Sequence, residues 1–257
     1  MAQYQDTAKT ALITGAAGGI GRAIALTLAG QGWRLLLTDR DIKALQATQQ
    51  RCQAEGLRPD VLAVDVTCEP EVAAAVHHVL RHYGRLDGVI SNAGVAGVVE
   101  SIADYPTEVF AQTMSINAKG TFLCLKHALP AMQVAGGGSF VAMGSTSSIR
   151  GRAHLAAYVA SKHAVLGLVR SVALETIGTG VRVNAVLPGP THTAMIDAIN
   201  GMAEQHAGDA VSPVRRAVAA PYGEPEDVAG TVAFLLSPQA RHLNGAALVV
   251  DGGSTLA

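Results

Sequence analysis

A tyrosine and a lysine four residues apart, Tyr158 and Lys162, are the side chains whose spacing most suggests chemistry. They lie in a stretch predicted to be helical, where positions i and i+4 share one face. An ammonium near a phenol favours the phenolate, so the pKa of Tyr158 is expected to fall from about 10 toward the range of a general acid or base. Ser145, thirteen residues upstream at the end of an apolar run, could hydrogen-bond a carbonyl oxygen. The Tyr–Lys spacing alone is weak evidence, because such pairs also occur on solvated helix faces.

Strands and helices that could position these groups alternate along the sequence. The predicted strands cover residues 10–14, 34–38, 61–64, 88–90, 139–143, 181–187 and 246–250. The predicted helices cover residues 22–29, 42–55, 69–83, 109–132, 153–176 and 224–236. The strands are apolar throughout, as expected when helices cover both faces of a parallel sheet. The pattern predicts one α/β domain over residues 1–257, built on a doubly wound (Rossmann) parallel sheet of seven strands.

One stretch departs from this alternation. Residues 191–220 are rich in Ala, Gly, His and Pro, and they show no clean hydrophobic period. A loop of that length is usually functional or disordered. We therefore interpret residues 190–220 as a segment that covers the substrate site.

A glycine-rich turn follows the first predicted strand and opens the first predicted helix. It reads Thr14-Gly15-Ala16-Ala17-Gly18-Gly19-Ile20-Gly21. Glycines let the backbone approach a phosphate, and the start of a helix offers N–H donors and positive potential. The alternative is a tight strand-to-helix turn that binds nothing. Its place after the first strand favours the pyrophosphate of a dinucleotide.

Aspartates end the second and third predicted strands. A carboxylate at Asp39 could accept hydrogen bonds from the adenosine ribose and would repel a 2′-phosphate, which favours NAD over NADP. Arg40 complicates this choice, because an arginine there can accommodate that phosphate; we give Asp39 more weight. Asp65 could contact the adenine. The alternative for both aspartates is to cap the helices that follow.

Together these and the following motifs resemble the short-chain dehydrogenase/reductase family over essentially the whole chain. The glycine turn is similar to the family's TGxxxGxG cofactor turn. Its NAG, PG and DGG elements are matched by Asn92-Ala93-Gly94, Pro188-Gly189 and Asp251-Gly252-Gly253. Its catalytic Asn, Ser and YxxxK positions are matched by Asn117, Ser145, Tyr158 and Lys162.

The resemblance implies hydride transfer between a nicotinamide and an alcohol or carbonyl compound. In the family's pattern Tyr158 is the acid/base, and Lys162 lowers its pKa and binds the nicotinamide ribose. Ser145 polarises the substrate oxygen, and Asn117 holds a water that relays protons to solvent. The candidate cofactor contacts are Gly15, Gly19, Ile20, Gly21, Asp39, Asp65, Val66, Asn92, Ala93, Gly94, Tyr158, Lys162, Pro188, Gly189, Thr191 and Thr193.

We therefore predict an NAD-dependent oxidoreductase that acts on a secondary alcohol or ketone, with a small polar or cyclic substrate. The alternative is an NADPH-dependent ketone or 3-oxoacyl reductase, which Arg40 would favour.

The stretch between Ser145 and Tyr158 is expected to border the substrate. It carries Arg150, Arg152 and His154, where the family often has small or apolar residues. One interpretation is recognition of a carboxylate, a sulfonate or a polyhydroxy group, because Arg pairs well with planar anions. The interpretation that we favour is that these cations face solvent or a neighbouring subunit, since an exposed Arg is the default. His192 is likewise interpreted as solvated.

The composition limits the partners. Hydrophobic residues make up 49% of the chain and charged residues 15%, so part of the surface is expected to be covered by another subunit. With the family resemblance this implies a homotetramer, in which helices 109–132 and 153–176 pair across a two-fold axis. The net charge of −1 and the lack of a basic block argue against nucleic acid and anionic membranes as partners.

Further absences in the sequence complete these expectations. No apolar run is long enough to span a membrane, and no cluster of His, Cys, Asp or Glu has metal-ligand spacing. The three cysteines lack C-x-x-C spacing, and the N-terminus is polar, which favours reduced thiols and a cytoplasmic protein.

Overall fold

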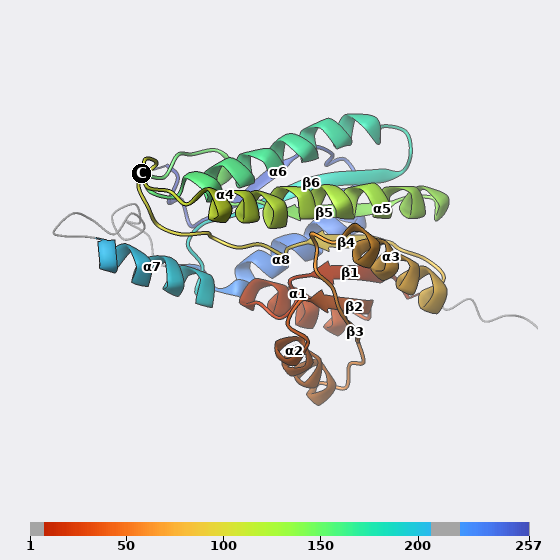
Figure 1. Cartoon of the computed structure of the whole chain (residues 1–257). Helices are drawn as coiled ribbons and strands as arrows, with labels where there is room; N and C mark the ends of the chain where they lie inside the picture. Colours follow the sequence, from red (N-terminus) through yellow and green to blue (C-terminus); the bar gives the residue numbers. More distant parts are fainter. Residues whose placement is uncertain (1–7, 207–221, 257) are drawn as a thin grey trace, which may run out of the picture.

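A seven-stranded sheet forms the middle layer of the molecule, with helices on both faces (Figure 1). The computed structural model describes residues 8–206 and 222–256. All neighbouring strands pair in parallel, in the order β3-β2-β1-β4-β5-β6-β7. The strands are β1 (Thr10–Thr14), β2 (Arg34–Asp39), β3 (Asp60–Ala63), β4 (Gly88–Ser91), β5 (Gly138–Met143), β6 (Val181–Pro188) and β7 (Ala247–Val250). The predicted fold class is confirmed.

The helices follow the strands in alternation. They are α1 (Gly19–Gly30), α2 (Ile42–Ala54), α3 (Glu69–Tyr83), α4 (Thr107–Met114), α5 (Gly120–Val134), α6 (Ala156–Glu175), α7 (Ala194–His206) and α8 (Pro225–Leu236). Short helical turns lie at η1 (Ser115–Lys119), η2 (Thr146–Ser148) and η4 (Pro238–Ala240).

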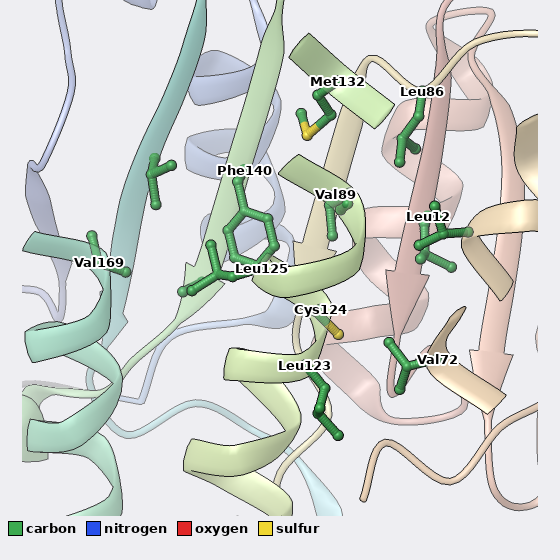
Figure 2. Close-up of a cluster of buried hydrophobic side chains, with 14 of the residues drawn as sticks. Leu12, Val72, Leu86, Val89, Leu123, Cys124, Leu125, Met132, Phe140 and Val169 are labelled. Atoms are coloured by element: carbon green, nitrogen blue, oxygen red, sulfur yellow. The ribbon is translucent and has the colours of Figure 1, made fainter. Parts of the chain in front are cut away.

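Each face of the sheet has its own core, because successive side chains of a strand point to opposite sides. Leu12 of β1 joins the cluster under α3, α5 and α6, which also holds Phe140 and Val169 (Figure 2). Ile13, the next residue, joins the cluster under α1, α2 and α8. Burial on both faces explains why the strands are apolar throughout rather than alternating.

The strand order reverses between β1 and β4. One half of the sheet runs outward from β1 through β2 to β3, and the other runs from β4 to β7. In such sheets a crevice opens beyond the carboxyl ends of the strands at this switch point. The glycine-rich turn after β1 and the Asn92-Ala93-Gly94 segment after β4 therefore lie side by side there.

Two predictions of secondary structure were wrong in detail. The single helix expected over residues 109–132 is interrupted by a π-helical turn at Ser115–Lys119, between α4 and α5. The stretch expected to be irregular contains α7, whose Ile196, Ile199 and Ala203 are buried against Leu155. The rest of the expected cover segment, residues 207–220, lies outside the described residues.

Candidate functional site

Two adjoining cavities lie at the carboxyl edge of the sheet. The larger, about 560 Å³, is lined by the glycine turn and by residues after β2, β3 and β4. The smaller, about 120 Å³, is lined by residues after β5 and β6 and by the start of α6. Both cavities are lined by Ile20, Asn92, Gly94, Thr193 and Met195. The arrangement suits an elongated ligand that ends beside a small one.

The glycine turn is held by the end of β4. Asn92 donates from Nδ2 to the carbonyls of Thr14 (3.1 Å) and Gly15 (3.0 Å). Thr14 Oγ1 in return accepts from the backbone N–H groups of Asn92 (3.0 Å) and Ala93 (3.1 Å). Gly15 has a φ of +66°, and a Cβ there would lie 2.7 Å from the Cα of Ala93. Only glycine suits this position, so the turn stays open for a phosphate to approach its backbone.

A second set of contacts supports the turn from behind. Arg22 donates from Nη2 to the carbonyl of Ala17 (2.9 Å) and from Nε to Thr48 Oγ1 (3.3 Å). The buried hydroxyl of Thr48 donates to the carbonyl of Ala16 (3.0 Å). Neither Arg22 nor Thr48 was predicted as part of the site, because Thr48 lies in the next helix and no local motif links it to the turn.

Asp39 belongs to the cavity and not to a helix cap. Its Oδ2 accepts from the N–H of Ala17 (3.2 Å), and its Oδ1 accepts from that of Asp41 (3.1 Å). The cap of α2 is Asp41, whose Oδ1 accepts from Lys43 and Ala44, each at 3.0 Å. Asp39 therefore lines the larger cavity with its carboxylate against the glycine turn. The exposed Arg40 lines the same cavity.

Asp65 and Val66 also line the larger cavity. The Asp65 carboxylate accepts from the N–H and the hydroxyl of Thr67, each at 2.8 Å, and these hydrogen bonds hold its pKa below the usual range. The residue that precedes α3 as its N-cap is Cys68, so Asp65 does not cap that helix.

The π-helical turn carries Asn117, which is buried beside Gly94 and lines neither cavity. Its Oδ1 accepts from the N–H of Val95 (2.8 Å), while Nδ2 donates to the carbonyl of Val95 (2.9 Å) and to Ser161 Oγ (2.9 Å). Ser161 Oγ donates onward to the carbonyl of Tyr158 (2.8 Å). The buried amide of Asn117 therefore joins the loop after β4 to the first turns of α6. π-Turns of this kind occur frequently at functional sites.

Lys162 is buried beside Asn117 and Gly94. Its ammonium donates to the carbonyl of Met143 at 2.8 Å, and a Cβ on Gly94 would lie 3.5 Å from its Nζ. Burial disfavours the charged ammonium and lowers the pKa of Lys162 to about 8. Lys162 is thus a buried cation at the junction of the two cavities.

Tyr158 lies in the smaller cavity, and its hydroxyl hydrogen-bonds with Ser145. Burial raises the pKa of Tyr158 above its ordinary value, opposed by the Ser145 hydrogen bond and by the positive charge of Arg152. The expectation that Lys162 lowers this pKa is therefore wrong for the structure described. The Nζ of Lys162 lies 5.6 Å from the centre of the Tyr158 ring and is engaged by Met143, so desolvation has the larger effect.

Ser145 is positioned by its own turn. Its Oγ accepts from the N–H of Ser147 (3.1 Å), and its N–H donates to Ser148 Oγ (3.2 Å), which together cap η2. Ser145 lines the smaller cavity together with Tyr158, and its choice over Ser147 and Ser148 as the catalytic serine stays a prediction. Ser147 also lines the cavity, and its hydroxyl accepts a hydrogen bond from Arg152. The Ser148 hydroxyl instead accepts from the N–H of Ser145 within the turn.

The segment after β6 completes the cavity wall. Pro188, Gly189 and Thr191 line it, and a Cβ on Gly189 would lie 2.9 Å from the Cα of Asp251. Thr191 Oγ1 donates to the carbonyl of Gly189 (3.1 Å), and Thr193 Oγ1 donates to that of Thr191 (3.2 Å). Thr193 precedes α7, and its methyl group would lie 3.0 Å from a Cβ on Gly19. The start of α7 thus packs against the glycine turn.

The position of Arg152 differs from the predicted one. It is partly buried and lines the smaller cavity, where Nε donates to Ser147 Oγ and Nη2 donates to Thr146 Oγ1, each at 3.2 Å. The prediction that it faces solvent was wrong, because the loop before α6 folds back over η2. Arg150 instead donates to the carbonyl of Ser254 (3.0 Å), and His154 and His192 are exposed.

Other kinds of site find no support in the described part of the chain. Within residues 8–206 and 222–256, no three His, Cys, Asp or Glu side chains gather as metal ligands. In the same ranges, no helix is long and apolar enough to cross a bilayer.

Curated relatives match nearly the whole chain. Levodione reductase from Leifsonia aquatica is 35% identical, with 98% of this chain and 96% of the relative covered. Cyclohexanol dehydrogenase from Acinetobacter sp. (strain SE19) is 36% identical, with 96% and 95% covered. Both names describe oxidoreductases.

Solved structures show the same fold. NAD⁺-bound xylitol dehydrogenase superposes with a TM-score of 0.89 at 31% identity, covering 95% of this chain and 98% of its own. A variant of actinorhodin polyketide ketoreductase, with NADPH, has a TM-score of 0.91 at 33% identity and covers 97% and 98%. The family profile described as enoyl-(acyl carrier protein) reductase matches residues 15–255. The chain belongs to the short-chain dehydrogenase/reductase family, whose members use nicotinamide cofactors.

Proposed function

We propose that this protein transfers a hydride between NAD(H) and a small secondary alcohol or its ketone. The observation that carries the proposal is the position of Ser145, Tyr158 and Lys162 in the smaller cavity, where it adjoins the glycine-lined one. A hydroxyl, a phenol and a buried ammonium at such a junction suit proton transfer to or from a substrate oxygen.

The larger cavity fits a dinucleotide. Side chains at Gly15 and Gly21 would collide with the surrounding backbone, so the turn has room for a phosphate only because these residues are glycine. A bound nicotinamide would supply the hydride acceptor or donor. The candidate holders are Gly15, Gly19, Ile20, Gly21, Asp39, Asp65, Val66, Asn92, Ala93, Gly94, Tyr158, Lys162, Pro188, Gly189, Thr191 and Thr193.

In the oxidative direction Tyr158, as the phenolate, would accept the proton of the substrate hydroxyl. Ser145 would hold the substrate oxygen by a hydrogen bond, and it stabilises the phenolate as well. Lys162 would hydrogen-bond the nicotinamide ribose. Reduction uses the same groups, with the Tyr158 hydroxyl donating the proton. Asn117 would anchor a water that connects Lys162 to solvent.

The preference for NAD rests on Asp39. Its carboxylate lines the cavity beside the glycine turn and is not occupied with capping α2. A carboxylate here accepts hydrogen bonds from ribose hydroxyls and repels a 2′-phosphate. The second candidate function is an NADPH-dependent ketone or 3-oxoacyl reductase, which the exposed Arg40 in the same cavity favours.

We also propose a cytoplasmic homotetramer and a single domain over residues 1–257 in which residues 190–220 cover the substrate. Large apolar side chains are exposed along α4, α5 and the end of α6, where a neighbouring subunit would bury them: Phe110, Phe122, Leu174 and Ile177. Cys52, Cys68 and Cys124 are free in the structure described.

A panel of secondary alcohols tests the reaction class. With NAD and each alcohol in turn, formation of the reduced cofactor is followed by its absorbance, and initial rates above the alcohol-free control are expected for small cyclic and polar members. The ketone of each active alcohol with NADH checks the reverse reaction. A protein that reduces ketones only with NADPH would support the second candidate function instead.

A further inference from the structure

The smaller cavity holds two cations and no acid among the described residues that line it. The cations are Arg152 and Lys162. Lys162 is engaged by the carbonyl of Met143, which carries a partial negative charge. Arg152 has only the neutral hydroxyls of Ser147 and Thr146 as hydrogen-bond partners in the structure described, and no carboxylate.

A partly buried guanidinium without a carboxylate beside it is unfavourable in free energy. Taking its charge out of water costs free energy that two neutral hydroxyls offset poorly. Burial lowers the pKa of Arg152, and the charge of Arg150 adds to this effect. An anion beside Arg152 would complete the arrangement, and a carboxylate matches the planar fork of Arg in geometry as well as charge.

The position of Arg152 connects it with the reacting groups. Its Nε bonds to the hydroxyl of Ser147, whose N–H bonds to the hydroxyl of Ser145. Its charge also acts on the Tyr158 phenol. A group held by Arg152 would therefore belong to the same small molecule whose oxygen meets Ser145 and Tyr158. The cavity is small, about 120 Å³, so that molecule has a short carbon chain.

One part of the cavity wall is apolar. Leu155, Ile196 and Ile199 line it and belong to one buried cluster. These side chains suit a short hydrocarbon portion, which leaves the anionic group to Arg152.

We propose that Arg152 binds a carboxylate on the substrate, which makes the substrate a short-chain hydroxycarboxylate or the matching oxocarboxylate. This inference rests on the proposed function, since it names the class of alcohol that the same site takes. Arg152 is a specificity-determining residue here and takes no part in proton or hydride transfer.

The test compares charged and neutral forms of one substrate. Short 2- and 3-hydroxycarboxylates, their methyl esters and simple neutral secondary alcohols are assayed with NAD for kcat/KM. The wild type is expected to prefer an acid over its ester by about 10–100-fold, the range of one charge-assisted hydrogen bond. Arg152→Met should lose this preference, so that its kcat/KM for the acid falls by about 10–100-fold more than its kcat/KM for the ester. Arg150→Met is the matched control and should keep the preference.

A second measurement does not depend on turnover. Propanoate, which has no hydroxyl to oxidise, is added at constant ionic strength against sodium chloride, and Tm is recorded. The wild type and Arg150→Met are expected to gain Tm with propanoate, and Arg152→Met is not.

The outcomes separate this inference from the proposed function. If neutral alcohols are oxidised but the acid-to-ester ratio is the same in wild type and Arg152→Met, only the role of Arg152 is overturned. If no alcohol is oxidised but propanoate raises Tm through Arg152, the anion site stands and the proposed function fails. Equal Tm changes in all three proteins, including no change in any, would overturn the anion site.

Discussion

The ammonium of Lys162 donates a 2.8 Å hydrogen bond to the backbone carbonyl of Met143, the last residue of β5. This bond joins the first turns of α6 to the strand that precedes Ser145. It places a buried cation in the middle of the site, and burial lowers the pKa of Lys162 to about 8. The strand end is thus stabilised by the same residue that is proposed to hold the nicotinamide ribose.

The low pKa of Lys162 predicts how stability depends on pH. Below about pH 8 the lysine is protonated in both the folded and unfolded states, and the folded state bears the cost of a buried charge. Between about pH 8 and 10.5 the unfolded chain binds more protons, so the Lys162 contribution to the free energy of unfolding rises with pH.

Lys162→Met removes this titration. At pH 7 the variant is expected to be more stable than the wild type by about 1–3 kcal/mol, part of the gain being offset by the lost bond to Met143. Urea unfolding from pH 7 to 10 measures both effects, and Lys126→Met at the surface is the control. A wild type and a Lys162→Met variant with parallel pH profiles would show that this lysine is not a buried cation.

Alanine variants of Asp39 and Asp41 form a matched pair for testing the preference between NAD and NADP. Asp39→Ala is expected to reduce the ratio of kcat/KM for NAD over NADP by about 10-fold or more, because the repulsion of a 2′-phosphate and the ribose hydrogen bonds are lost. Asp41→Ala is expected to leave the ratio unchanged and to lower the free energy of unfolding by about 0.5–2 kcal/mol, the loss of a helix cap. An unchanged ratio in Asp39→Ala would remove the basis for the NAD preference.

Thr48 supports the glycine turn without reaching the cavity lining. Thr48→Val keeps the shape but removes the bonds to the Ala16 carbonyl and to Arg22 Nε, and a cost of about 1–3 kcal/mol in stability is expected. The KM for the cofactor is expected to rise about 3–10-fold with a smaller change in kcat. Thr231→Val, which removes a hydroxyl on α8 that donates to the carbonyl of Asp227, is the control. A variant with lowered stability and an unchanged KM would show that the turn keeps its shape without this support.

The exposed apolar side chains predict assembly. Sedimentation is expected to show a tetramer, and Phe122→Glu on α5 is expected to yield a species of lower mass, because a carboxylate would be buried in the interface. Ile42→Glu, on α2 and away from those helices, is the control. A wild-type monomer at micromolar concentration would contradict the tetramer.

The sheet was predictable from the sequence because each strand is a short apolar run that must be covered on both faces. Leu12 and Ile13, adjacent residues buried on opposite faces, illustrate the pattern. Residues that line the two cavities were predictable where they lie at or just after a strand end, as Asp39 and Ser145 do. Parallel strands bring such ends to one edge, which local patterns can indicate.

What remained unpredictable depends on tertiary contacts. Helix α7 contains Gly201, which weakens its helical signal, and its buried stripe is stabilised by packing on Leu155. No distinctive residue type marks the π-turn at Asn117 in the sequence. The turn is accompanied by hydrogen bonds between the Asn117 side chain and the backbone of Val95. The inward position of Arg152 rests on Thr146 and Ser147, and spacing along the chain says nothing of that contact.

The turnover rate of Tyr158→Phe shows most directly whether Tyr158 transfers the proton in the proposed reaction. The change removes one hydroxyl from the smaller cavity and leaves the ring, so cofactor binding should persist while kcat for the best alcohol falls by about 10²–10⁴-fold. Tyr83→Phe is the control, since its hydroxyl donates to the carbonyl of Leu35 away from the cavities. Loss of turnover is expected only in Tyr158→Phe. Full turnover by that variant, with normal cofactor binding, would show that Tyr158 is not the acid/base.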